Sequence, residues 1–268
     1  PGNGSMHTKF VILDGQKIAT GSFNWETGSS SENHENMVLT DDPDLVAAYA
    51  KRFEALAGEP LRPRTEATNR AAARSAFFGP DEQLHRVVGQ LIDGAKKSLH
   101  IAMFTAKDFD FNENGQTTSM LRKVVAAKNR GVDVHFMTDR DIAEASEYFG
   151  VISRDDQNDE WLESQGVPVV LANPTFATYS SMHHKFMVVD GATVATGAFN
   201  WYYDSAMLND EDVLIVRDPS LAARYIGEYA DLARRYDPQY KASAFPMVDL
   251  VLSVKNDKTT YGDKVLLL

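Results

Sequence analysis

The sequence predicts an α/β protein made of two repeats, each a mixed β-sheet flanked by helices, related by a pseudo-twofold axis. A duplicated block predicts the repeats, because residues 6–49 recur in one register as residues 182–225 without a gap. Strand-like apolar runs alternate with amphipathic helices before the second block, which predicts a mixed sheet covered on both faces. The chain has 268 residues, of which 43% are hydrophobic, so it can bury a sizeable core.

Both copies of the block carry the same polar residues at the same places. The second copy contains His183, Lys185 and Asp190, followed by Asn200 and Glu211. Their counterparts lie 176 residues earlier (183 − 7 for the first of them) and are His7, Lys9, Asp14, Asn24 and Glu35. A lone His-x-Lys pair would be weak evidence, but two copies in one register indicate a duplicated catalytic module.

The first repeat, residues 1–57, is predicted to hold a hairpin, a further strand and a helix. The sequence Asp-Gly at 14–15 favours a tight turn, which predicts hairpin strands before and after it. The predicted strands are 8–13, 17–22 and 35–40. A helix is predicted over Pro43–Ala57, with Asp42 as its cap and a proline at its first position.

Residues 58–76 are interpreted as a linker because they combine prolines with several arginines, and residues 77–240 as a complete second repeat. The predicted helices of that repeat are 81–95, 118–130, 157–165 and 219–236, and the strands before its motif are 98–104, 132–137 and 167–171. Before His183 the second repeat has 106 residues (77 through 182), but only six residues precede His7. We therefore expect the first repeat to lack about a hundred residues and the chain to be a fragment.

Residues 241–268 lie beyond the duplicated unit and are predicted to begin a β-rich module. Two alternating runs, 248–254 and 264–268, flank a polar turn. This tail resembles the opening of a starch-binding β-sandwich module, which would make a polysaccharide a partner. A generic β extension is an equal alternative.

The order His-x-Lys, then Asp, then Gly-Ser-x-Asn resembles the signature of the phospholipase D superfamily. The form Gly-Ser-Phe-Asn-Trp at residues 21–25, with Asn-x-Glu downstream, is most similar to the small nuclease and mitochondrial cardiolipin-hydrolase branch. The resemblance implies a phospholipase D-like fold. It also implies a phosphodiesterase that uses a phosphohistidine intermediate and no cofactor.

By this resemblance, one histidine becomes the phosphohistidine, while the other protonates the leaving alcohol and then activates water. Family precedent makes His7 the nucleophile and His183 the acid and base, although the two could be exchanged. Glu35 and Glu211 would each accept the Nδ1–H of an imidazole, so that Nε2 faces the phosphate.

Fixed donors would bind the non-bridging phosphate oxygens in the transition state. The predicted donors are Lys9, Lys185, Asn24 and Asn200. Ser22 would bind substrate as a further donor, but the second copy has Ala198 at that position, so the site is not chemically symmetric. Four residues are interpreted as structural: Asp14, Asp190, Trp25 and Trp201.

The other histidines have ordinary interpretations. His100 and His135 are expected to be hydrogen-bonded core residues, and His34 and His85 to be exposed. A zinc site is the main alternative to the two-histidine site, because histidines with nearby carboxylates bind zinc readily. A lysine two residues along the same face would repel a cation, so we expect no metal.

The sequence favours phospholipid over nucleic acid as substrate, with an endonuclease of the same chemistry as the alternative. The charge of −11, from 27 basic and 38 acidic residues, and the acid-rich segment 139–163 both disfavour a polyanion. Phe109 and Phe111 are predicted to bind lipid or enter a membrane surface, with burial under their loop as the alternative. A non-catalytic protein that docks on polysaccharide through its tail is a third possibility, which the intact motifs argue against.

Overall fold

The computed structural model describes residues 4–58, 72–144, 157–175 and 180–241, and the backbone of 147–148, 151–152 and 264–267. The described helices are α1 (Thr27–Ser31), α2 (Pro43–Ala57), α3 (Leu84–Gly94), α4 (Met120–Asn129), α5 (Arg140–Ala143), α6 (Asn158–Ser164), α7 (Tyr203–Met207) and α8 (Pro219–Tyr236). The described strands are β1 (Phe10–Leu13), β2 (Lys17–Gly21), β3 (Asn36–Thr40), β4 (Arg74–Phe78), β5 (Ser98–Met103), β6 (Phe111–Glu113), β7 (Gln116–Thr118), β8 (Asp133–Asp139), β9 (Glu147–Tyr148), β10 (Val151–Ile152), β11 (Val169–Ala172), β12 (Lys185–Val189), β13 (Thr193–Gly197), β14 (Asp212–Arg217) and β15 (Lys264–Leu267).

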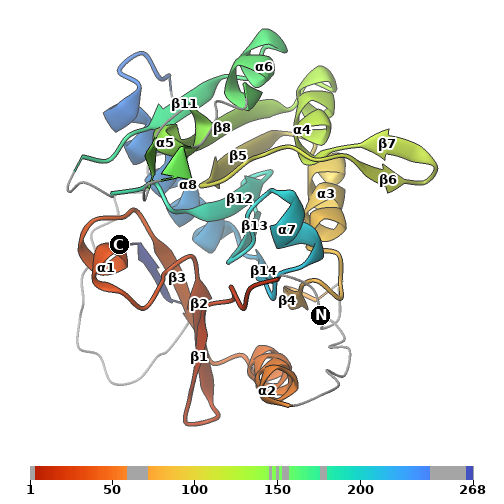
Figure 1. Cartoon of the computed structure of the whole chain (residues 1–268), viewed down its shortest axis with the longest axis vertical. Coiled ribbons are helices and arrows are strands. Elements are labelled where there is room, and N and C mark those ends of the chain that lie inside the picture. Colours follow the sequence, from red (N-terminus) through yellow and green to blue (C-terminus); the bar gives the residue numbers. More distant parts are fainter. Residues whose placement is uncertain are drawn as a thin grey trace.

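The larger sheet belongs to the second repeat and has seven strands in the order β11-β8-β5-β12-β13-β14-β4. Strands β11, β8 and β5 are parallel, and the other neighbours are antiparallel. Helices α3 and α4 pack on one face and α8 on the other (Figure 1), so β5 and β12 are buried along their whole length. The predicted mixed sheet with helices on both faces is confirmed.

From its motif onwards, the first repeat follows the second element by element. Helices α1 and α7 correspond at both ends (203 − 27 and 207 − 31 both equal 176), and β3 corresponds to β14. The smaller sheet has the order β1-β2-β3-β15, and β15 of the tail pairs antiparallel with β3, as β4 pairs with β14. The tail's other predicted strand, 248–254, lies outside the described residues, and its likeness to a starch-binding module stays a prediction.

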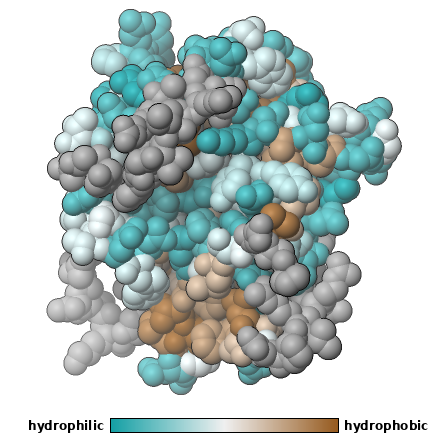
Figure 2. All heavy atoms as spheres, viewed as in Figure 1, coloured by the Kyte–Doolittle hydropathy of each residue, from teal (hydrophilic) through white to brown (hydrophobic). Residues whose placement is uncertain are grey.

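The first repeat is less covered than the second. Among the described strands β1 pairs only with β2, whereas its counterpart β12 also pairs with β5. Figure 2 shows hydrophobic residues gathered over the end formed by β1 and α2, where Leu13 is 43% and Phe53 is 58% exposed. In the described structure, β1 is therefore an edge strand.

Buried polar bonds hold the two repeats together at the pseudo-twofold axis. Asp212, at the start of β14, accepts hydrogen bonds from three hydroxyls of the first repeat: Thr8 at 2.6 Å, Thr20 at 2.7 Å and Tyr49 at 2.7 Å. The equivalent residue, Asn36, accepts at Oδ1 from two hydroxyls of the second repeat: Thr196 at 2.7 Å and Tyr225 at 3.0 Å. Each strand start is thus fixed by the other repeat, and a relative shift would leave buried polar groups unpaired.

Most expected element boundaries differ from the structure by a few residues, and two of the differences change the interpretation. Strand β1 begins at Phe10, so His7 and Lys9 lie in the segment that enters the strand and not in the strand itself. Strand β4 begins at Arg74, inside the segment interpreted as a linker, because Arg74 to Phe78 pair with the edge of β14. Residues 59–71 of that segment lie outside the described part of the chain.

Two histidines expected at the surface are buried, so that expectation is wrong. His34 is 7% exposed because it lies where the repeats meet, and His85 is 1% exposed because the β6–β7 region covers it. His100 and His135 are buried as expected, with their rings stacked 4.7 Å apart. None of the described helices combines the length and apolarity needed to cross a membrane.

The two motif tryptophans have different environments. Trp201 is 2% exposed, donates its backbone N–H to the Thr105 carbonyl and packs against Phe136 of β8. Trp25 is 68% exposed and contacts the ring of Phe23. The structural interpretation is therefore wrong for Trp25, because in the described structure the first repeat has no strand in the place of β8.

Acid should destabilise this fold through its buried histidines. Burial lowers the pKa of His85 and of His100 from 6.5 to about 4. The unfolded chain therefore takes up these protons near pH 6.5, whereas the folded chain does not until about pH 4. The stability that depends on neutral histidine is complete above pH 6.5 and falls as the pH drops towards 4.

We expect His100→Phe to reduce this loss by about 2 kcal/mol between pH 7.5 and pH 5, because it keeps a ring at the site and removes the titrating group. The measurement is the free energy of unfolding in urea at pH 7.5 and at pH 5 for both proteins. An identical pH dependence in the variant would contradict the assignment.

Candidate active site

The strand starts of the two repeats converge and bring both motifs into one site. His7 and His183 lie just before β1 and β12, and Glu35 and Glu211 lie just before β3 and β14. His7 Nδ1 is 2.8 Å from Glu211 Oε2, and His183 Nδ1 is 2.7 Å from Glu35 Oε1. Each histidine is thus paired with the glutamate of the other repeat, so both halves of the site need both repeats.

Backbone hydrogen bonds also join each motif histidine to the other repeat. The His7 N–H donates to the carbonyl of Asp210 at 2.9 Å, and the His183 N–H donates to the carbonyl of His34 at 3.0 Å. Asp210 and His34 each directly precede the glutamate that holds the histidine ring. Backbone and side chain of each motif histidine are therefore positioned by one short segment of the other repeat.

A serine hydroxyl supports each glutamate, but the two serines come from different positions. Ser22 donates to Glu35 at 2.5 Å and is fully buried, so it positions the carboxylate and is not placed to bind substrate. In the second repeat Ala198 replaces this serine, and Ser205 of α7 donates to Glu211 at 2.5 Å. Ser205 therefore gives Glu211 the support that Ser22 gives Glu35, although Ala198 stands at the position of Ser22. Sequence reasoning missed Ser205, although a serine also stands at the equivalent position, Ser29.

The electrostatics of the His183 half-site keep its ring neutral and oriented. Burial alone would raise the pKa of Glu35, but the hydrogen bond and charge of His183, together with Lys185 and the Ser22 hydroxyl, hold it below its usual value. An ionised Glu35 accepts the Nδ1–H, which leaves Nε2 as the free acceptor. Burial, followed by the charge of Lys185, lowers the pKa of His183 to about 4.

The two histidines differ in exposure. The side chain of His183 is 9% exposed and packs edge-on against the ring of Phe104, with centroids 4.6 Å apart. The side chain of His7 is 26% exposed. Phe104 follows β5, a strand for which the described first repeat has no counterpart. His183 is therefore less exposed than His7 because Phe104 covers its ring.

Both motif lysines are buried beside the histidines. Lys185 Nζ donates to the His183 carbonyl at 2.8 Å and lies 4.9 Å from the centroid of the Phe104 ring. Lys9 makes the equivalent bond to the His7 carbonyl. Burial lowers the pKa of both lysines, that of Lys185 to about 7. A bound phosphate anion would raise these values again and hold both lysines as cations.

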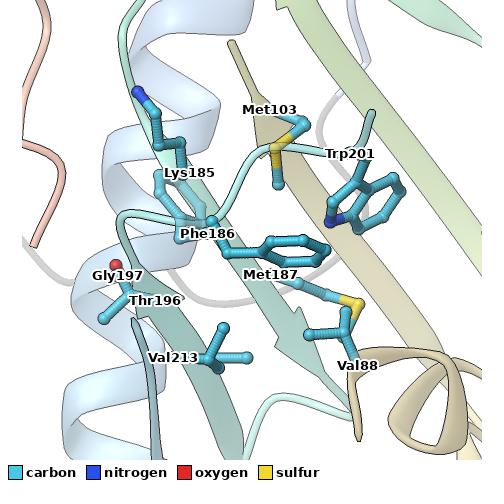
Figure 3. A pocket seen from close by; sticks show the side chains of 11 residues that line it. Val88, Met103, Lys185, Phe186, Met187, Thr196, Gly197, Trp201 and Val213 are labelled. Atoms are coloured by element: carbon cyan, nitrogen blue, oxygen red, sulfur yellow. The ribbon is translucent and has the colours of Figure 1, made fainter. Parts of the chain in front are cut away.

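An apolar pocket behind Lys185 contributes to this burial. Its walls include Val88 of α3, Met103 of β5, Met187 of β12 and Trp201. In Figure 3 these side chains turn towards one another, while the ammonium of Lys185 points away from them. The lysine stem is therefore anchored in the core and its charge is directed to the site.

The two motif asparagines are not equivalent. Asn200 is 3% exposed, its backbone N–H donates to Ser205 at 3.1 Å, and its Oδ1 has no hydrogen-bond partner among the described residues. Asn24 is half-buried and donates to Glu26 at 3.2 Å. Asn200 is therefore fixed on its backbone side, whereas the Asn24 amide is held by a carboxylate of its own loop.

The turn aspartates also differ. Asp190 accepts from the backbone N–H groups of Lys96, Lys97 and Ser98, at 2.6 to 3.1 Å, and so ties the motif turn to the start of β5. Partial burial opposes ionisation, but these bonds hold the pKa of Asp190 below its usual value. Asp14 is exposed at the corresponding turn.

Phe109 and Phe111 do not project from the surface as a membrane contact would. Phe111 is 6% exposed and Phe109 packs against the core. Both rings contact His85, at centroid distances of 4.7 and 5.8 Å. The expectation of exposed aromatics is wrong because β6 turns these side chains towards α3, and neither residue is placed to bind substrate.

Within the described residues, no group of three or more histidine and acidic side chains is arranged to hold a metal ion. The predicted site residues that the structure does bring together are both His–Glu pairs and both lysines. The charges of Lys9, Lys185, Glu35 and Glu211 act on one another across the repeats. Such a cluster can hold a phosphoryl group between two imidazoles and two ammonium groups.

Duplicated His–Lys motifs joined by crossed carboxylates, on a mixed sheet with pseudo-twofold symmetry, define a phospholipase D-like protein. The chain matches the family described as "Cardiolipin synthase, PLD-like domain" over residues 2–57 and 88–232. It belongs to this family, and within the phospholipase D superfamily it is similar to the nuclease and cardiolipin-hydrolase branch.

Two curated relatives are the mitochondrial cardiolipin hydrolases of Xenopus tropicalis and Xenopus laevis. The first is 31% identical over 151 residues (54% of this chain, 58% of that protein), and the second is 32% identical over 159 residues (59% and 64%). The chain thus spans about three fifths of their length. Phosphatidylserine synthase of Haemophilus influenzae shares the fold, with a TM-score of 0.60 at 14% identity over 86% of this chain and 62% of that one.

The crossed pairing predicts large effects from small changes. We expect Glu35→Gln and Glu211→Gln each to lower kcat by about a hundredfold or more, because an amide no longer fixes the imidazole tautomer. Ser22→Ala and Ser205→Ala should each cost about tenfold, since they loosen the carboxylate without removing it. The assay is turnover of a soluble chromogenic phosphodiester. Ser30→Ala is the control, because this exposed hydroxyl bonds only to the Thr27 carbonyl.

Double-mutant cycles on the free energy of unfolding test the crossing itself. His7→Ala should couple to Glu211→Gln and not to Glu35→Gln, because contacting residues are non-additive and separated ones add. Stronger coupling within a repeat than between repeats would refute the crossed arrangement.

Proposed function

We propose that this protein is a phosphodiesterase that cleaves phospholipid head-group esters through a phosphohistidine. The observation that carries the proposal is the pair of crossed His–Glu contacts, at 2.7 and 2.8 Å, with a lysine beside each histidine. Two oriented imidazoles supply both a nucleophile and an acid, which a two-step phosphoryl transfer requires. Lys9 and Lys185 supply the charge that stabilises the transition state.

The proposed reaction balances in two steps. In the first, Nε2 of one histidine forms a bond to phosphorus, the bond from phosphorus to the leaving oxygen breaks, and the other histidine gives that oxygen a proton. In the second, the now neutral histidine takes a proton from water, whose oxygen attacks phosphorus as the P–N bond breaks. Both glutamates keep their negative charge throughout and stabilise the imidazolium that forms on each side.

The assignment of His7 as nucleophile stays a prediction from family precedent. The low pKa of His183 favours the reverse, because a ring that is neutral in the free protein is ready to attack and poorly suited to donate a proton. Peptide mapping of the trapped phosphoenzyme distinguishes the two assignments. Label on residues 180–185 would assign attack to His183, and label on residues 4–9 would assign it to His7.

Lipid is the proposed substrate for two reasons. The matched relatives are named cardiolipin hydrolases, and the chain carries a net charge of −11, which opposes a nucleic-acid partner. The acid-rich segment 139–163 repels nucleic acid less than its composition suggests. Asp139 and Asp159 are buried, and burial raises the pKa of Asp139 to about 7. Among the described residues of the segment, the exposed acids are Glu144, Glu160 and Glu163.

An endonuclease with the same chemistry is the second candidate, because nothing in the two-histidine site distinguishes one phosphodiester from another. Polysaccharide docking through the tail has no support from any described residue, and the family model matches residues 2–57 and 88–232, which precede the tail.

The histidine variants test the chemistry. We expect His7→Ala and His183→Ala each to lower turnover by at least about a thousandfold with the fold intact by circular dichroism, because the two rings act as a unit. Turnover should also survive EDTA, and the phosphoenzyme should be acid-labile and base-stable as a phosphoramidate is. Activity within tenfold of wild type in either variant, or a need for added metal, would refute the mechanism.

A side-by-side assay tests the substrate. Phospholipid vesicles, single-stranded DNA, RNA and a chromogenic phosphodiester are each offered at physiological salt. We expect vesicles to be hydrolysed, and a primary alcohol to divert product to the transphosphatidylated lipid, because a small nucleophile can replace water in the second step. Cleavage of DNA or RNA with vesicles untouched would replace the lipase by the nuclease.

A further inference from the structure

The residues that hold the two catalytic histidines by their backbone differ in side-chain chemistry. Asp210 and His34 are equivalent positions (210 − 34 = 176), and their carbonyls accept the N–H groups of His7 and His183. Each also directly precedes a catalytic glutamate. A displacement at either position therefore moves both the histidine and the carboxylate of one half-site.

In the His7 half-site an ion pair holds this position. Arg52 of α2 is fully buried and donates to Asp210 Oδ1 at 2.8 Å, to the Gly79 carbonyl at 2.5 Å and to Asp81 Oδ2 at 3.3 Å. A guanidinium stays charged at any pH at which proteins fold. The position of Asp210 is therefore insensitive to pH until its own carboxylate is protonated.

In the His183 half-site histidines replace the ion pair. The counterpart of Arg52 in α8 is Glu228 (228 − 52 = 176), and its Oε1 is 3.2 Å from His184 Nε2. The ring of His184 stacks on that of His34 with centroids 6.4 Å apart. His34 Nε2 is 2.7 Å from the hydroxyl of Tyr236. The carbonyl that holds His183 thus depends on two buried imidazoles.

The hydrogen bonds require His184 to be neutral. Asn36 Oδ1 accepts from Thr196 and Tyr225, so the Nδ2 of Asn36 faces His184 Nδ1, at 3.2 Å, as a donor. His184 Nδ1 must therefore be the acceptor, and its Nε2–H donates to Glu228. A second proton on His184 would set two donors against each other in a fully buried place.

The surroundings of His34 also disfavour a proton. Burial, followed by the positive charge that His184 can carry, lowers the pKa of His34 to about 4, and Arg235 acts in the same direction. Glu228 and Glu35 oppose this, and Asp139 acts on the neighbouring Tyr236. Burial would raise the pKa of Glu228, but the bond from His184 holds it below its usual value.

We propose that His34 and His184 form a proton-sensitive positioning element for the catalytic His183, whereas Arg52 and Asp210 hold His7 independently of pH. This inference rests on the proposed phosphodiesterase function. A proton on His34 breaks its stacked, hydrogen-bonded arrangement with His184 and Tyr236 and displaces the His34 carbonyl together with the adjacent Glu35. The ring of His183 then loses its backbone anchor and its carboxylate at once, and acid inactivates this half of the site first.

The acid limb of the pH profile tests the proposal. With bis-p-nitrophenyl phosphate, the acid limb of log kcat/KM against pH should approach a slope of about 2 in the wild type, from one proton on a catalytic histidine and one on the pair. In His34→Gln, which keeps a hydrogen-bonding amide near Tyr236 and takes no proton, the slope should fall to about 1. Each curve is normalised to its own value at pH 7.5, and kcat should change more than KM.

Two further variants separate positioning from general damage. His34→Asp with Glu228→Arg copies the Arg52–Asp210 pair into the second half-site and should also give a slope of about 1. Asp210→Asn, in the other half-site, should leave the slope of its normalised curve at the wild-type value. Equal slopes in the wild type and both His34 variants would overturn the proposal.

A measurement that needs no turnover keeps the proposal distinct from the proposed function. In protein with ¹⁵N-labelled imidazoles, the His183 Nδ1–H resonance should shift or broaden as His34 titrates, and should not do so in His34→Gln. If no phosphodiester is cleaved but this coupling is seen, the function fails and the positioning element stands. A His183 resonance that ignores the titration of His34 would refute the element even in an active enzyme.

Discussion

The crossed histidine–carboxylate pairs are the constraint on which the rest of the structure depends. Glu35 and Glu211 are both fully buried, and a buried carboxylate is tolerable only when its oxygens are hydrogen-bonded or paired. Each finds a hydroxyl inside its own repeat, but the imidazole it needs comes from the other repeat. Neither repeat can bury its glutamate alone, so assembly of the repeats and assembly of the site are one event.

This constraint explains why the duplication keeps its register while the surrounding polar groups have diverged. The positions proposed to be catalytic would share one substrate, and they have the same residue type in both repeats. The positions behind them face only each other, so a change on one element can be balanced on its partner. Asp212 with Thr8 corresponds to Asn36 with His184, and Arg52 with Asp210 corresponds to Glu228 with the two histidines. The equivalent helix residues have opposite charge, since Arg52 of α2 corresponds to Glu228 of α8. The backbone hydrogen bonds to His7 and His183 are nevertheless the same.

The proposed site residues could be predicted from one sequence because the duplication repeats them at a fixed offset. The sheet could be predicted because strand-like runs alternate with amphipathic helices before the second motif. The pairing of each histidine could not, since the same spacing of 28 residues (35 − 7 and 211 − 183) fits contacts within a repeat and between repeats. Ser22 and Phe111 were assigned to substrate because polar and aromatic residues near a motif resemble binding groups. Their burial depends on the strands that close over them, which local sequence does not encode. The polar neighbours of His34 in the sequence indicate exposure. The residue is buried by a contact across the pseudo-twofold axis, which the local sequence does not reveal.

Burial also tunes the site to its ligand. Two ionised glutamates and two protonated lysines would leave the empty site without net charge, but burial lowers the pKa of Lys185 to about 7 and lowers that of Lys9 as well. Near neutral pH part of the lysine charge is therefore absent until an anion enters. A phosphodiester monoanion restores it, because a negative oxygen beside each ammonium favours the charged form. Proton uptake is thereby coupled to binding, and the ammonium charge is complete only when the phosphoryl oxygens are in place to use it.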